Sequence, residues 1–138
     1  MPNKATAREW LEKAYHNLSS ARILYDADHY TDTIGFELQQ AIEKILKSFL
    51  ACENKQIKKT HNLIEVYELV TDHIRLDESK IRILGIATNY YTHERYPVGR
   101  LELPPRKETK EVLDFAQGLF EKACQILDVD QQEIKKSV

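Results

Sequence analysis

The segment "DTIGFELQQAIEKILKSFLAC", residues 32–52, decides the fold of this chain, because its apolar residues recur with the period of a helix. The stripe consists of Ile34, Leu38, Ala41, Ile42, Ile45, Phe49 and Cys52. The charged residues fall largely off it: Glu37, Glu43, Lys44 and Lys47. Glu43 and Lys47 are spaced as a favourable ion pair. Gly35 predicts a close approach of another helix, since glycine otherwise weakens a helix interior.

Two of the other amphipathic segments begin with recognisable capping residues. In the first, residues 6–25, Thr6 and Glu9 have the spacing of a capping box, in which each side chain bonds the other residue's backbone amide. Asn62 and Glu65 repeat that spacing farther along the chain. We therefore expect helices to start near Thr6 and near Asn62.

Two further helices complete the pattern. One runs from about Asp77 and ends by Tyr96, because Pro97 disfavours helical dihedral angles in the residue before it. The last starts near Glu108. Each apolar stripe has to be covered by neighbouring helices. We therefore predict an all-α fold, an antiparallel up-and-down helical bundle of about five helices, in a single domain comprising residues 1–138.

Composition limits the classes of partner and compartment. The net charge of −2 argues against indiscriminate binding of nucleic acid, so any such contact is expected to be local. The candidates are the basic stretches 54–61 and 104–110, and the alternative for each is a solvated loop. The sequence contains neither a membrane-spanning apolar run nor a secretory signal, and Cys52 and Cys124 are lone thiols. We expect a cytoplasmic protein.

Local signatures of cofactor, metal and hydrolase chemistry are missing from the sequence. The four glycines lie far apart, so neither a P-loop nor a dinucleotide fingerprint is present. No two histidines have the spacing of a helical metal pair. Asp26, Asp28 and His29 offer possible ligands for a divalent ion, although a polar turn after a helix explains them equally. We therefore expect neither cofactor nor metal.

Four strings of the sequence, taken in order, resemble the HEPN (higher eukaryotes and prokaryotes nucleotide-binding) family. They are "WLEKAYHNLSSA" (10–21), "ELQQAIEKILKSFL" (37–50), "KTHNL" (59–63) and "YYTHERYP" (90–97). The likeness extends from Trp10 to about Leu127. It implies an up-and-down helical bundle that is commonly a homodimer. It also implies a minimal nucleotidyltransferase protein as partner, in a pair of the toxin–antitoxin kind.

Other members of that family are metal-independent ribonucleases, which carry an arginine followed after four to six residues by a histidine. In this chain the order is reversed, because His93 precedes Arg95 and no histidine follows Arg95. Arg22 and His29 have the required spacing, but they lie in the first helix and the turn after it, whereas the family's pair belongs to a later helix. The resemblance therefore does not carry nuclease activity over to this chain.

The cluster "NYYTHERYP", residues 89–97, is the best candidate for a ligand site. On a continuous helix Asn89 shares a face with His93, and Tyr91 shares the adjacent face with Arg95. That spacing makes Tyr91 the deeper aromatic residue and Tyr90 the more peripheral one. Arg95 presents a donor fork suited to phosphate, and Tyr91 or Tyr96 offers a face for a base. A structural alternative is that Arg95 pairs with an acidic residue and the tyrosines hydrogen-bond within the bundle.

Three residues outside the cluster are further candidates. His61 either bonds at a helix start or helps to line the same cleft. Glu43 and Lys44 are typical of a solvated face, whereas the alternative is that Lys44 and Lys47 project toward a ligand from this helix. The hypothesis is a nucleotide- or RNA-binding regulatory module, with possible nucleotide contacts at Arg95, Tyr91, Tyr96, Asn89, His61, Lys44 and Lys47. The alternatives are a toxin ribonuclease using His93 and Arg95, and a purely structural dimerisation module.

Overall fold

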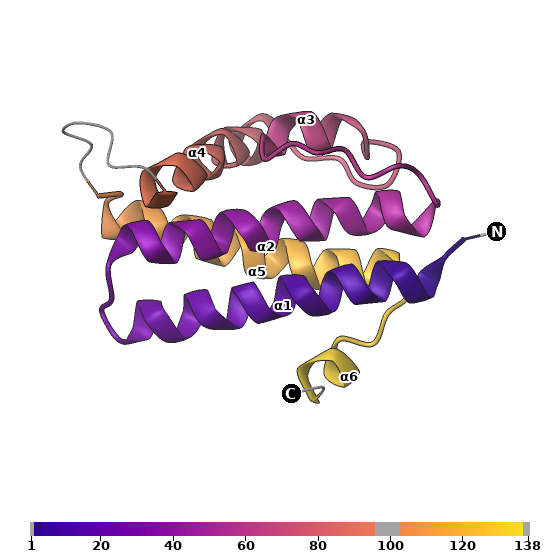
Figure 1. The fold of residues 1–138 in the computed structure, drawn as a ribbon, viewed down its shortest axis with the longest axis horizontal. Helices are drawn as coiled ribbons and strands as arrows, with labels where there is room; N and C mark the ends of the chain where they lie inside the picture. Colours follow the sequence, from indigo (N-terminus) through magenta and orange to yellow (C-terminus); the bar gives the residue numbers. More distant parts are fainter. Residues whose placement is uncertain (1, 96–102, 137–138) are drawn as a thin grey trace.

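The computed structural model describes residues 2–95 and 103–136, with the side chains of residues 93–95 outside that description. The described part contains six helices and no strand (Figure 1). They are α1 (Lys4–Asp26), α2 (Thr31–Cys52), α3 (Leu63–Glu68), α4 (Glu78–Arg95), α5 (Arg106–Ile126) and α6 (Gln131–Lys136). The all-α bundle is confirmed, and α6 is a short helix that the apolar pattern did not predict.

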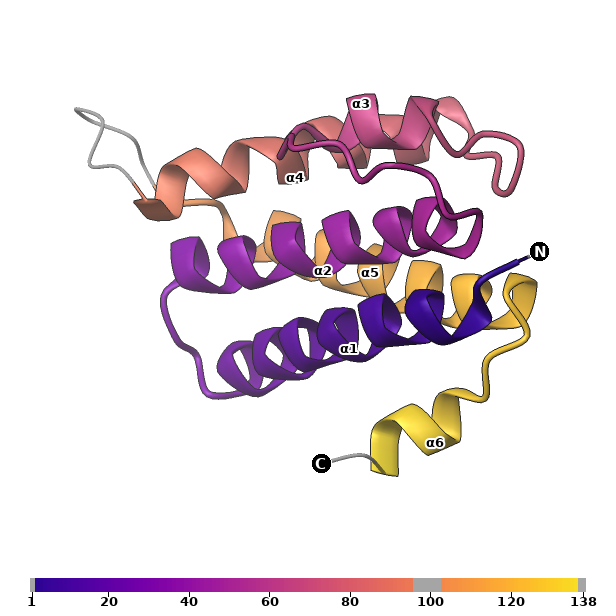
Figure 2. The same ribbon diagram turned by 45° about the vertical axis from the view of Figure 1, so that its right-hand side comes forward.

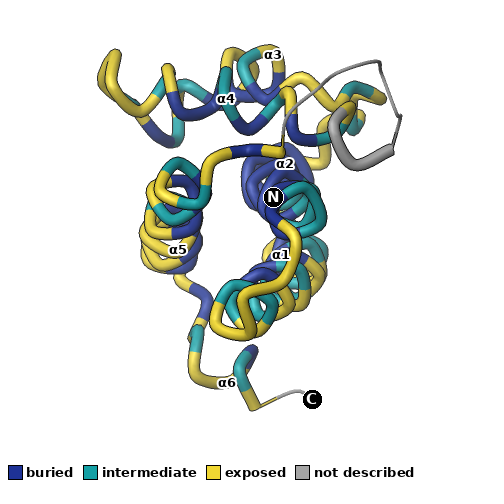
Figure 3. Tube along the Cα trace, turned by 90° about the vertical axis from the view of Figure 1, so that its left-hand side faces the viewer, coloured by how far each residue is buried: buried dark blue, intermediate teal, exposed yellow. Residues whose placement is uncertain are grey.

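Helix α2 occupies the centre of the bundle. It contacts α1, α3, α4 and α5, and α1 runs antiparallel beside it (Figure 2). Seen along the bundle, α3 and α4 cover one side of α2, while α6 lies on the opposite side of the molecule, next to α1 (Figure 3). Because neighbours surround α2, its burial extends beyond the apolar stripe to polar positions such as Gln39 and Ser48.

The helix starts follow from local hydrogen bonds. Asn62 caps α3 as predicted, since its Oδ1 accepts from the amides of Ile64 at 3.0 Å and Glu65 at 3.3 Å. Helix α1 starts near Thr6, as expected, but the prediction that Thr6 is the capping residue is wrong. Asn3 is the capping residue there, and its Oδ1 accepts from the Thr6 amide at 3.1 Å, so the helix begins at Lys4.

The close helix approach predicted from Gly35 is confirmed, and the partner is Tyr90 of α4. A Cβ atom at Gly35 would lie 2.8 Å from the Tyr90 Cγ atom. Tyr90 is 1 % exposed, and its hydroxyl donates to Glu108 at 2.6 Å, which ties α4 to α5. The prediction that Tyr91 is the deeper aromatic residue is therefore wrong. The space left by Gly35 admits the Tyr90 ring, and Tyr91 lies half-buried at the edge of the interface.

Among the described residues, no helix combines the length and the apolar character that crossing a lipid bilayer requires.

Candidate functional site

A charged pair is buried on the face of α2 that meets the connection between α2 and α3, residues 53–62. The Lys47 Nζ atom lies 2.9 Å from the Glu43 Oε2 atom, and the two residues are 5 % and 6 % exposed. The predicted pairing is thus present, but the interpretation of Glu43 as part of a solvated face is wrong. The connection folds back over α2 and removes both groups from water.

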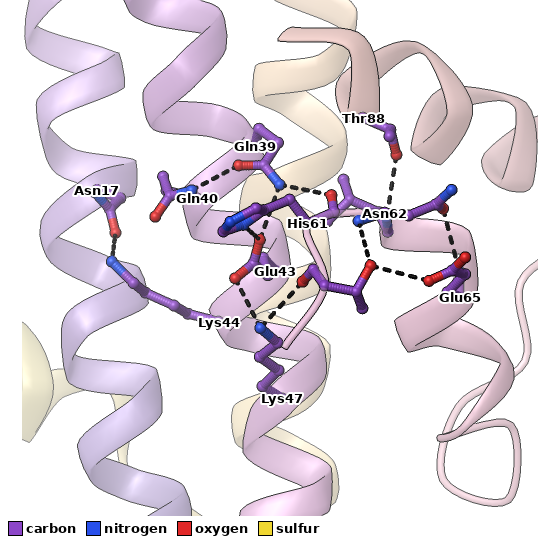
Figure 4. Close-up of polar contacts among 12 residues, drawn as sticks. Asn17, Gln39, Gln40, Glu43, Lys44, Lys47, His61, Asn62, Glu65 and Thr88 are labelled. Carbon is purple, nitrogen blue, oxygen red and sulfur yellow. Dashed lines mark hydrogen bonds and ion pairs between the residues drawn. The ribbon is translucent and has the colours of Figure 1, made fainter. Parts of the chain in front are cut away.

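Neighbouring polar groups compensate for this burial. Glu43 Oε1 lies 2.9 Å from His61 Nδ1 and accepts from Gln39 Nε2 at 3.0 Å (Figure 4). Lys47 also donates to the Thr60 carbonyl oxygen at 3.2 Å, and Gln39 Nε2 donates to the His61 carbonyl oxygen at 2.9 Å. Side chains of α2 therefore hold the backbone carbonyl groups of Thr60 and His61, just before α3, and also the His61 ring.

The electrostatics of Glu43 follow from these contacts. Burial acts to raise the pKa of Glu43, but hydrogen bonds from Lys47, His61 and Gln39 outweigh it. The net result is a pKa below the ordinary value, so Glu43 is a carboxylate at neutral pH. A carboxylate can only accept hydrogen bonds, so Nδ1 of His61 carries the proton in this contact and Nε2 is the ring nitrogen that Glu43 does not engage.

The His61 ring forms one surface of an aromatic stack. It lies parallel to the Tyr91 ring, with 4.0 Å between the centroids and an interplanar angle of 16°. Tyr91 in turn contacts Phe36 of α2, at a centroid distance of 5.7 Å. The His61 side chain is 51 % exposed, so much of it is open to solvent, although its Nδ1 atom is held by the contact with Glu43. We call these three residues the His61–Tyr91–Phe36 stack.

Helix α4 holds the position of His61 from the other side. The Leu63 amide donates to Thr88 Oγ1 at 3.1 Å, which links the first turn of α3 to α4 (Figure 4). Thr60 Oγ1 accepts from the Asn62 amide at 3.1 Å and donates to Glu65 at 2.9 Å. Residues on both sides of His61 are therefore fixed, and the exposed ring is well positioned before any ligand arrives.

The predicted site residues do not all lie together. His61 and Lys47 contact Glu43 directly, and Tyr91 is stacked on His61, as described above. Lys44 extends to α1 instead, where its Nζ donates to Asn17 at 2.7 Å (Figure 4). Burial lowers the pKa of Lys44 against the opposing influence of nearby carboxylates. Asn89 is exposed on α4.

The remaining predicted contact residues lie at the C-terminal end of α4 or beyond it. Helix α4 continues through Arg95, as the prediction of an end by Tyr96 requires, but the side chains of His93 and Arg95 are outside the described set. Tyr96 itself lies outside the described residues. For the hypothetical catalytic pair, His93 and Arg95, the structure therefore gives only the backbone positions, near the C-terminal end of α4.

Three other polar residues considered in the sequence, Arg106, Asp28 and His29, have structural partners. In the basic stretch 104–110, Arg106 lies 4.2 Å from the Tyr25 ring centroid, donates to the Tyr25 carbonyl oxygen and pairs with Asp28 at 3.0 Å. It thereby caps the C-terminal end of α1. His29 packs edge-on against Tyr30. Within the described part of the chain, no three His, Cys, Asp or Glu side chains form a group able to hold a metal ion.

Sequence reasoning missed the central role of Glu43, and it missed Gln39 and Phe36 altogether. Gln39, Glu43 and Lys47 are spaced four residues apart, so they form a continuous polar stripe on α2. The stripe itself was visible in the sequence, but its burial beneath residues 53–62 was not.

Comparison with known proteins identifies relatives of the fold. A family model described as "HEPN domain" matches residues 7–127. The crystal structure of TT1696 from Thermus thermophilus is 26% identical, with a TM-score of 0.74, and the match covers 87% of this chain and 97% of that chain. ST0689, described as an archaeal HEPN homologue, is 21% identical with a TM-score of 0.64 and the same coverage, which shows likeness of fold alone. No curated protein matches the chain significantly.

Proposed function

The chain belongs to the HEPN domain family, and from this premise we propose that it is a nucleotide- or RNA-binding regulatory module that acts with a minimal nucleotidyltransferase protein. The observation that carries the proposal is the half-exposed His61 ring, stacked on Tyr91 and fixed through Glu43. A fixed aromatic ring whose side chain is half exposed to solvent suits an unstacked base.

The surroundings of the stack supply charge for a phosphate. Lys58 and Lys59 are exposed and lie three and two residues before His61, respectively. Arg95 follows Tyr91 by one helical turn, so its backbone lies on the same side of α4. We propose that the base stacks on His61 and that these cations, together with Asn89 and Tyr96, contact the sugar and phosphate.

Direct binding tests the proposal. A labelled single-stranded RNA oligonucleotide and labelled ATP are titrated with the parent protein, with His61→Ala and with His16→Ala. His16 is an exposed histidine on α1 and serves as the matched control. Loss of one base–aromatic stack corresponds to about 1–3 kcal/mol, so His61→Ala is expected to weaken binding by about 5- to 150-fold. Equal affinities for the two variants would refute this site, and absence of binding to the parent would refute ligand binding.

The partner is tested separately. We propose a homodimer that binds the nucleotidyltransferase, since exposed apolar side chains such as Ile23 and Tyr30 leave apolar surface for association. Co-expression with a tagged small nucleotidyltransferase from the same genome is expected to yield a stable complex on size exclusion with light scattering. Two separate peaks, with this chain at monomer mass, would refute both the partner and the dimer.

A further inference from the structure

A half-enclosed cavity lies between α1 and α5, apart from the His61–Tyr91–Phe36 stack. Its volume is about 150 Å³, which is enough for a benzene-sized body. The floor is apolar and buried, formed by Leu18, Leu113 and Phe120. The Tyr15 ring packs on Phe120 with the centroids 5.6 Å apart, which makes one wall aromatic.

Two cations line this cavity, and neither has a carboxylate partner among the residues that the structure describes. Arg22 donates to the neutral amide oxygen of Gln117, and Lys135 forms no ion pair within the described part of the chain. By contrast, Arg8, Arg82 and Arg106 each hold a carboxylate at 3.0 Å or less. Glu121 also lines the cavity, but it forms no ion pair with either cation. The site therefore combines an apolar floor with one carboxylate, Glu121, and two positive charges, neither of which forms an ion pair with an acidic residue in the described part of the chain.

Helix α6 completes the cavity. It contributes Lys135, and it is anchored through Ile134, which is 2 % exposed, and through the ion pair between Arg8 and Glu133 at 2.8 Å. Residues 131–136 lie beyond the segment 7–127 that matches the family model. The cavity is thus a composite of the family domain and an additional C-terminal helix of this chain.

We infer that this cavity binds a compact organic anion, an aromatic or branched apolar body that carries one carboxylate. The apolar body rests on Leu18, Leu113 and Phe120, where it loses contact with water. The carboxylate lies between Arg22 and Lys135, and the planar guanidinium of Arg22 matches its geometry. Because Lys135 belongs to α6, an occupied site holds α6 against the bundle.

Benzoate is a suitable probe, with benzamide as the neutral isostere and acetate as the anion without an apolar body. Each is titrated into the full-length protein and followed by amide chemical shifts in NMR spectra. Benzoate is expected to shift the amides of Ser19, Gln117 and Lys135 and to bind at least about tenfold more tightly than either comparison compound. Absence of binding, or equal affinity for benzamide, overturns the inference.

Variants locate the site. Arg22→Gln and Lys135→Gln are each expected to weaken benzoate binding about tenfold, whereas Arg75→Gln, at an exposed arginine outside this cavity, leaves it unchanged. Ser19→Phe fills the cavity and is expected to abolish binding. The inference is overturned if Ser19→Phe shows the same cooperative unfolding transition as the parent, and is therefore folded, and still binds benzoate. His61→Ala leaves benzoate affinity unchanged, so this test is independent of the proposed RNA site.

Discussion

The Glu43 carboxylate and the Lys47 ammonium group lie 2.9 Å apart on successive turns of α2, and each side chain is only 7 % exposed. Removing one partner leaves the other charge buried and unpaired, which typically costs about 3–5 kcal/mol. We therefore expect Glu43→Leu and Lys47→Leu each to lower the free energy of unfolding by roughly that amount. Replacing both residues together is expected to cost less than either single change. Urea denaturation measures all three variants.

A solvent-exposed pair with the same spacing provides the control. Lys110 and Asp114 on α5 lie 2.7 Å apart, with side chains 42% and 56% exposed. Asp114→Leu is expected to change the free energy of unfolding by less than about 1 kcal/mol, because exposed pairs contribute little. If Glu43→Leu were as mild as Asp114→Leu, burial of the Glu43–Lys47 pair would be contradicted.

Acid is expected to destabilise the protein partly through Glu43. The pKa of Glu43 is lower in the folded protein than the ordinary value of 4.5, so folding favours its ionised form. The resulting stability is present above the pKa of the unfolded chain and is lost as pH falls through the folded pKa. Unfolding free energies measured from about pH 7 down to about pH 3 should therefore fall more steeply for the parent than for Glu43→Gln.

Exposed carboxylates do not affect the difference in pH dependence between the parent and Glu43→Gln. Hydrogen bonds, chiefly from Lys55 and Ser79, also lower the pKa values of Glu53 and Asp77 respectively, but both groups are present in the parent and in Glu43→Gln. Their contribution cancels when the two pH profiles are subtracted. Parallel profiles would mean that Glu43 has the same pKa in the folded and unfolded chains.

RNA is expected to bind without being cut. His93 precedes Arg95, and no histidine follows Arg95 to complete the spacing found in the ribonucleases of the family. We expect single-stranded and transfer RNA to stay intact in the presence of EDTA, while Arg95→Ala weakens binding through loss of a phosphate contact. Denaturing gels and a parallel binding titration measure the two effects. Cleavage by the parent that Arg95→Ala abolishes would establish the ribonuclease alternative instead.

The helical framework was predictable because its determinants are local or periodic. The stripe of α2 and the Asn62 cap both appear in the structure as the sequence indicates. The relative depths of Tyr90 and Tyr91 were not predictable in the same way. Both follow Ala87 at helical spacing, and only the position of Gly35 on another helix selects Tyr90 for the interior.

The candidate site depends even more on tertiary contacts. Helical periodicity places Glu43 and Lys47 together, but it cannot reveal that residues 53–62 fold back and cover them. The stack of His61 on Tyr91 joins residues 30 positions apart, and its geometry is set by the bonds of His61 to α2 and of Leu63 to α4. Such a site needs coordinates to be recognised, although its residue types were visible in the sequence.

Gly35 is expected to be the glycine least tolerant of a side chain. An alanine Cβ there would lie 2.8 Å from Tyr90 Cγ and 3.2 Å from Tyr90 Cβ, and the ring cannot retreat freely because its hydroxyl bonds Glu108. Overpacking of this kind costs about 1–3 kcal/mol, which exceeds the gain of about 1 kcal/mol from replacing a helical glycine. Gly35→Ala is therefore expected to lower the free energy of unfolding.

Gly118 on α5 is the matched control, because a Cβ there meets no atom within 4 Å. Gly118→Ala is expected to stabilise the protein by about 0.5–1 kcal/mol through helix propensity alone. Tyr91 follows Tyr90 in α4, so displacement of α4 by Gly35→Ala should also disturb the stack on His61 and weaken RNA binding, whereas Gly118→Ala should not. Equal stabilisation by both substitutions in urea denaturation would contradict the close packing of α2 against α4.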